Sequence, residues 1–198
     1  MTDTTLTPAG HTIPAVFTRA QIDWLPWLEP LPADGMTPRQ IESLVDASRV
    51  KSAYFRLLAR DPDALEARTR TDKDIFYNPE GGAPRAEREL AATAVSRLNG
   101  CIYCASVHAR FSATYSKRES DVEKLLAEGV GADLGERWNA VVAVSVALTT
   151  TPITFTPAHV TRLRAAGMED RAISDIIHAA SFFNWANRLM LSLGEPAV

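Results

Sequence analysis

The sequence predicts an all-α protein, because helix-capping signals recur along the chain and strand patterns do not. Thr37, Asp61 and Thr156 each precede a proline, which suits a capping residue followed by the first turn of a helix. Glycines 100, 129 and 194 stand where such helices would end. No segment alternates between apolar and polar residues with turn signals on both sides, as a half-buried strand would.

The N-terminal residues 1–35 are expected to form an irregular arm. Four prolines between Pro14 and Pro32 argue against a helix, and Trp24 and Trp27 argue against a fully solvated tail. We expect the arm to pack on the body of the protein or on a neighbouring subunit. Residues 36–198 are predicted to form a single helical domain.

The predicted helices follow in order along this domain. One covers residues 37–50 and begins at Thr37, with Gln40 as the second member of a capping box. The next begins after Asp61, and a loop over residues 78–84 ends it. Later helices are predicted over residues 85–98, from Cys101 onward, and over 119–128, 135–148, 157–167 and 169–193.

Composition and charge exclude several classes of function. The 198 residues carry a net charge of −3 without a basic run, so nucleic-acid binding is not expected. The first residues lack the features of a signal peptide. The longest apolar stretch, residues 138–148, is about half of the ~20 residues that a membrane helix needs. A soluble cytoplasmic protein without a membrane partner is therefore expected.

The segment LNGCIYCASVHARF, residues 98–111, holds both cysteines of the chain and one of its four histidines. On a helix, Cys101, Cys104 and His108 share one face. The helix N-terminus favours a thiolate at Cys101, and His108 can accept a proton from a thiol one turn earlier. Because a Cys-X-X-Cys pair can form a reversible disulfide, the triplet predicts a dithiol redox centre.

Three other interpretations compete with a redox centre. A closed zinc site needs four ligands, and no second Cys-X-X-Cys is present to complete one. A c-type haem site requires a histidine directly after the second cysteine, where this chain has Ala105. Two buried structural thiols beside a hydrogen-bonded core histidine remain an alternative. The spacing therefore disfavours a zinc site and excludes a c-type haem site.

A histidine base is usually oriented by a neighbouring carboxylate, and the triplet itself contains none. The preceding helix offers Glu87 and Glu89, which point in nearly opposite directions, so only one can face the thiols. Spacing alone leaves the choice between them open.

Glu89, the Cys101-Ile-Tyr-Cys104 pair and His108 together resemble the signature of the AhpD-like alkylhydroperoxidases, within the carboxymuconolactone decarboxylase superfamily. The stretches YFRLLARDP and HAASFFNWANRLMLSLGEP are similar to the uncharacterised peroxidase-related branch of that superfamily. The resemblance implies an all-helical AhpD-like fold, assembled as a homotrimer or hexamer. It also favours Glu89 over Glu87.

The resemblance further implies a role for each residue. Cys104 would attack the peroxide, although the helix dipole favours Cys101 as the more acidic thiol. Cys101 would resolve the intermediate and donate a proton, and His108 and Glu89 would form a proton relay. AhpD itself has a histidine directly before the second cysteine, where this chain has Tyr103. A phenol with a pKa of about 10 cannot replace a base at neutral pH, but it can hydrogen-bond a peroxide.

The implied function is a thiol-dependent hydroperoxide reductase with peroxiredoxin activity and no haem, flavin or metal. An external dithiol, either lipoyl-type or thioredoxin-like, would reduce its disulfide. The alternatives are a lactone decarboxylase-like enzyme, which does not need the cysteine pair, and a dithiol redox sensor or helical oligomeric scaffold without turnover. Tyr103 and His178 are weaker expectations for the substrate pocket, since a histidine on an apolar helix is more often packed in the core.

Overall fold

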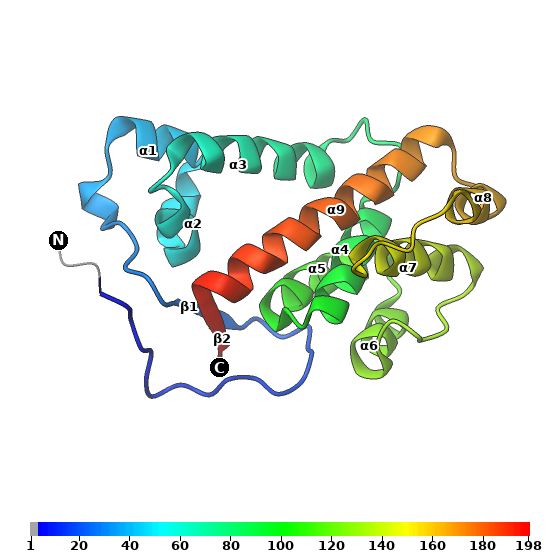
Figure 1. Ribbon diagram of the computed structural model, residues 1–198, viewed down its shortest axis with the longest axis horizontal. Coiled ribbons are helices and arrows are strands. Elements are labelled where there is room, and N and C mark those ends of the chain that lie inside the picture. The colour runs from blue at the N-terminus through cyan, green and yellow to red at the C-terminus, as the bar shows by residue number, and fades with distance from the viewer. Residues whose placement is uncertain (1–3) are drawn as a thin grey trace.

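The structure, a computed structural model, describes residues 4–198 and is built mainly from α-helices (Figure 1). Its central element is α4 (Arg85–Asn99), which is buried along most of its length. Helices α5 (Ile102–Ser116), α7 (Glu136–Thr149) and α9 (Asp170–Leu193) pack against α4. The all-α prediction is confirmed.

The remaining helices cover this core. In Figure 1, α1, α2 and α3 lie above α9, whereas α4, α5 and α7 lie below it. None of the helices in residues 4–198 is both long enough and apolar enough to cross a lipid bilayer. The covering elements are α1 (Pro38–Ser43), α2 (Ala53–Leu58), α3 (Pro62–Tyr77), α6 (Glu119–Glu128), α8 (Pro157–Ala165) and the 3₁₀ turns η1 (Ala33–Gly35) and η2 (Ala47–Lys51).

The capping signals read from the sequence are present in the structure. The backbone N–H of Thr37 donates to Gln40 Oε1 at 2.8 Å, and the N–H of Gln40 donates to Thr37 Oγ1 at 3.3 Å. Asp61 accepts a hydrogen bond from the N–H of Ala64 at 3.1 Å. Local side-chain chemistry therefore sets the starts of α1 and α3.

The prediction of one helix over residues 37–50 is correct only as far as Ser43. Helix α1 ends at Ser43, Val45 has a positive φ of 61°, and Asp46 then caps the separate turn η2. The Asp46 carboxylate accepts from both the N–H and the hydroxyl of Ser48, and this local hydrogen bonding competes with a continuing helix. Helix α2 was not predicted.

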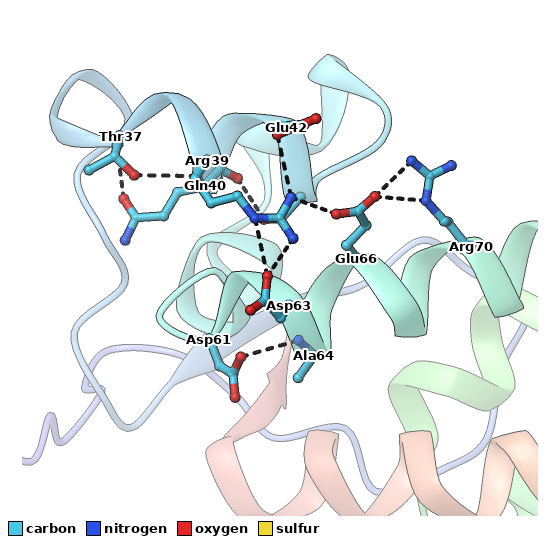
Figure 2. A network of polar contacts seen from close by, with 10 residues as sticks. Thr37, Arg39, Gln40, Glu42, Asp61, Asp63, Ala64, Glu66 and Arg70 are labelled. Atoms are coloured by element: carbon cyan, nitrogen blue, oxygen red, sulfur yellow. Dashed lines mark hydrogen bonds and ion pairs between the residues drawn. The ribbon is translucent and has the colours of Figure 1, made fainter.

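An arginine network joins α1 to α3 (Figure 2). Arg39 forms ion pairs with Asp63 and Glu66, each at 2.5 Å, and Glu66 also pairs with Arg70 at 2.7 Å. Exposed pairs of this kind contribute about 0–1 kcal/mol each. The network therefore orients the first helix more than it stabilises the fold.

A segment of the N-terminal arm pairs with the C-terminal segment in a short antiparallel sheet, which the sequence analysis did not predict. Strand β1 (Asp23–Pro26) pairs with β2 (Gly194–Ala197), and the indole N–H of Trp24 donates to the carbonyl of Met190 at 3.2 Å. The strands are too short to show periodicity, and their partners lie far apart in sequence. Residues 23–26 of the N-terminal arm thus pack on the C-terminal part of the body.

Candidate active site

The turn between α4 and α5 places the thiols. Gly100 ends α4 in the left-handed conformation, with φ of 81°, and Cys101 becomes the N-cap residue of α5. Cys104 and His108 follow on successive turns of α5, and all three residues are buried. The helix end and the new start predicted at this position are confirmed.

A cavity of about 270 Å³ opens beside these residues. Cys104, His108 and Glu89 line it, together with Tyr103, whereas Cys101 does not. Cys101 is 2% exposed and Cys104 is 6% exposed. A small molecule in the cavity therefore meets the sulfur of Cys104 and not that of Cys101.

Glu89 and His108 form a buried hydrogen-bonded pair at this cavity. His108 Nδ1 lies 2.6 Å from Glu89 Oε2, and because a carboxylate only accepts, Nδ1–H is the donor. Arg85 Nε donates to the other carboxylate oxygen at 3.0 Å. The imidazole ring also packs on Phe183, with ring centroids 4.0 Å apart. This arrangement fixes the ring and leaves Nε2 as the nitrogen that can exchange a proton.

Glu87 faces the opposite side of α4, as the helical period requires. Its carboxylate accepts hydrogen bonds from Arg137 Nε at 2.5 Å and Nη2 at 2.9 Å. The structure thus distinguishes the two glutamates, between which the sequence spacing could not choose. Glu89 contacts His108, and Glu87 joins α4 to α7.

The two thiols interact with each other, and they differ in pKa and in access to the cavity. The hydrogen bond between the thiols is the largest influence lowering the pKa of Cys101, and the backbone N–H of Cys104 lowers it further. The same hydrogen bond, followed by burial, raises the pKa of Cys104, while Asn187 and the charge of Arg68 oppose this rise. In the singly ionised pair the charge therefore lies mainly on Cys101, as the helix-dipole argument expects, whereas Cys104 faces the cavity.

Asn187 is a site residue that the sequence did not identify as one. Its side chain is fully buried, donates to Ser96 Oγ at 3.0 Å and accepts from Asn99 Nδ2 at 3.1 Å. The amide also lowers the pKa of Cys101. An asparagine within the apolar segment SFFNWANRLM was the signal available in the sequence.

Several arginines were also missed. Arg85, which holds Glu89, has its guanidinium 4.2 Å from the ring centroid of Tyr77 and 4.4 Å from that of Tyr115. Arg49 and Arg68 line the cavity itself. The sequence did not indicate that these arginines lie at the cavity, because arginine is usually a surface residue.

The two weaker pocket expectations have different outcomes. Tyr103 lines the cavity, and burial raises the pKa of its phenol. His178 is exposed and lines a separate depression with Arg171 and Asp175, so it is neither a core residue nor part of the thiol cavity. It lies about 140° around α9 from Phe183, which explains why it faces outward. Within residues 4–198, no group of three or more His, Cys, Asp and Glu side chains is placed to hold a metal ion.

Comparisons with known proteins agree with this fold. Residues 62–147 match the carboxymuconolactone decarboxylase family. The alkylhydroperoxidase AhpD core structure of an uncharacterized peroxidase-related protein from Ralstonia eutropha JMP134 is 22% identical, with a TM-score of 0.70, covering 83% of this chain and 88% of that one. No curated protein sequence matches the chain.

Two further structures have the same fold. An uncharacterized peroxidase-related protein from Silicibacter sp. TM1040 is 23% identical, with a TM-score of 0.67 over 98% of this chain and 95% of that one. The debrominase Bmp8 is 18% identical, with a TM-score of 0.65 over 83% of this chain and 88% of that one. The match over residues 62–147 and the shared helical fold show that this chain is similar to the carboxymuconolactone decarboxylase family and has the fold of these peroxidase-related structures.

Proposed function

We propose that this protein reduces organic hydroperoxides with the Cys101–Cys104 dithiol. The observation that carries the proposal is that Cys104 and the His108–Glu89 pair line one cavity, with His108 Nδ1 2.6 Å from Glu89 Oε2. A nucleophilic sulfur and an oriented acid–base group are thus available to the same bound molecule.

The first step is attack of the Cys104 thiolate on the terminal oxygen of the hydroperoxide. The proton shared by the two thiols moves to Cys101, which leaves the charge on the sulfur that faces the cavity. The S–O bond forms as the O–O bond breaks, Cys104 becomes a sulfenic acid, and the peroxide is reduced to an alkoxide. Protonated His108, held by Glu89, supplies the proton that converts the alkoxide to an alcohol.

The second step closes the disulfide. Cys101 attacks the sulfenic sulfur, and the hydroxyl group leaves as water with the proton that Cys101 carried. An external dithiol of the lipoyl or thioredoxin-like type then reduces the disulfide by thiol–disulfide exchange. Each cycle therefore consumes one hydroperoxide and one dithiol, and it yields one alcohol, one water and one external disulfide.

The test is peroxide consumption by the reduced protein with cumene hydroperoxide and an excess of dihydrolipoamide or reduced thioredoxin. We expect many turnovers, with a Cys101–Cys104 disulfide detected by mass spectrometry when the reductant is withheld. Because the chain has only two cysteines, any thiol modification maps to this pair.

Two matched variants separate the roles of the thiols. Cys104→Ser is expected to abolish both peroxide consumption and disulfide formation. Cys101→Ser is expected to consume a single equivalent and to accumulate a sulfenic acid that dimedone traps. Unchanged consumption by Cys104→Ser would overturn the proposal, and a single oxidation without turnover under every dithiol would identify a sensor instead.

A further inference from the structure

The cavity beside Cys104 has a second wall, whose side chains carry out no bond-forming or proton-transfer step of the proposed reaction. This wall consists of Arg49 from η2, Tyr54 from α2 and Arg68 from α3. These three elements precede the thiol-bearing helix α5 in the chain. We propose that this wall binds an anionic group, a carboxylate, so that the substrate is a small organic hydroperoxide that also carries a carboxylate. This inference rests on the proposed function for the hydroperoxide and on the arginine wall for the anion.

The wall holds buried donors that no residue in 4–198 satisfies. They are Arg49 Nη1, Arg68 Nε and Nη1, and Tyr54 Oη. Arg68 is 7% exposed and Tyr54 is 7% exposed. Unpaired donors at this depth cost free energy, and a carboxylate offers several lone pairs that accept from them.

The positive charge of the wall is only partly balanced. Arg49 Nη2 donates to Asp72 Oδ2 at 3.3 Å, while Arg68 Nη1 lies 3.7 Å from the same oxygen, which is too far for a hydrogen bond. One carboxylate therefore serves two guanidinium groups. Glu89, the other acid lining the cavity, is engaged by Arg85 and His108. The wall formed by Arg49, Arg68 and Asp72 therefore keeps a formal charge of +1.

Aromatic rings also pack around the guanidinium group of Arg68. Its guanidinium carbon lies 5.4 Å from the ring centroid of Phe55, 5.3 Å from that of Phe182 and 5.8 Å from that of Tyr54. Ring faces stabilise a cation through their quadrupole and leave its donors free. Burial also raises the pKa of Tyr54 to about 12, so its hydroxyl remains a donor at neutral pH.

The rest of the cavity suits the apolar body of such a substrate. The apolar part of the cavity lining includes Phe76, Val107, Phe183 and Met190. The volume of about 270 Å³ lies just below the usual range for drug-sized ligands, ~300–1,000 Å³. It is adequate for one aromatic ring or a short acyl chain with its head group.

The activity test compares cumene hydroperoxide with its para-carboxylate analogue, which differ only in the anionic group. We expect kcat/KM to favour the carboxylate by about tenfold or more, as charge-assisted hydrogen bonds to arginine predict. Arg68→Met should reduce this ratio towards one, and Arg49→Met should reduce it in part. Arg70→Met is the matched control, because Arg70 lies on the same helix, is 64% exposed and does not line the cavity.

A binding test separates this inference from the proposed reaction. Calorimetry on the Cys101→Ser/Cys104→Ser double variant compares 4-isopropylbenzoate with the neutral 4-isopropylbenzamide. Tighter binding of the benzoate, lost in Arg68→Met or Arg49→Met, supports the anionic substrate class even if no hydroperoxide is turned over. Equal binding of the two ligands, together with equal kcat/KM for the two hydroperoxides, would overturn the inference and leave hydroperoxide reduction standing. If Arg68→Met does not fold, Arg49→Met and the wild-type ligand pairs decide the outcome.

Discussion

The two buried glutamates of α4 allow a sharp test of the relay. Glu89→Gln and Glu87→Gln make the same chemical change two residues apart on one helix, and each glutamate accepts hydrogen bonds from two donors. A glutamine oxygen replaces one carboxylate acceptor, and its amide group faces the other donor. Hydrogen bonds to charged groups contribute about 1.5–3 kcal/mol, so each variant should lose roughly 2 kcal/mol of unfolding free energy.

The two variants should differ in turnover. Glu89 is 1% exposed and is held against His108, so its loss removes the group that orients the proton donor. Correctly placed acid–base groups contribute about 10²–10⁴-fold, and we expect kcat of Glu89→Gln to fall by about 100-fold or more. Glu87 contacts Arg137 and lies away from the cavity, so Glu87→Gln should keep the wild-type kcat.

The assay measures urea unfolding and dithiol-dependent peroxide turnover on the same preparations. The relay would be refuted if Glu89→Gln kept kcat within about threefold while showing the expected loss of stability. It would also be refuted if Glu87→Gln, still folded, lost turnover to the same extent as Glu89→Gln. Either result would show that turnover follows stability and not the contact with His108.

Two further predictions follow from the thiol pair and from the chain ends. Cys104→Ala removes the hydrogen bond that most lowers the pKa of Cys101 and leaves its burial, so the pKa of Cys101 should rise. The midpoint of the pH dependence of Cys101 alkylation should therefore move to higher pH than in the wild type, and an unchanged midpoint would contradict the assignment. A Cβ at Gly194 would lie 2.3 Å from the Leu25 carbonyl oxygen, so Gly194→Ala should cost about 1–3 kcal/mol in urea unfolding. Gly131→Ala, where a Cβ meets no atom within 4 Å, should leave stability nearly unchanged, and equal stability of the two variants would contradict the close packing at β2.

Most helix starts could be predicted from the sequence, and each error has a physical cause. The caps at Thr37 and Asp61 act over three or four residues, so their chemistry is visible without a structure. The early end of α1 was missed because Asp46 opens a competing turn at residues that otherwise continue a helical pattern. The pairing of β1 with β2 was missed because each strand has only four residues and its partner lies at the other end of the chain.

The candidate site was predicted in part. Cys101, Cys104 and His108 lie on one helix, so the helical period alone brought them together. The resemblance to AhpD favoured Glu89, and the structure places this residue against His108. His178 was misplaced, since the composition of α9 does not reveal which of its faces meets the cavity.

The sequence by itself determined an all-α chain with two thiols and a histidine on one helical face, because capping and helical periodicity depend on residues a few positions apart. Only the tertiary structure decided that Cys104 and not Cys101 faces the cavity, and that Arg49 and Arg68 form its other wall. These relations join helices that are distant along the chain. They depend on how α3, α5 and α9 pack around α4, and no local pattern specifies that packing.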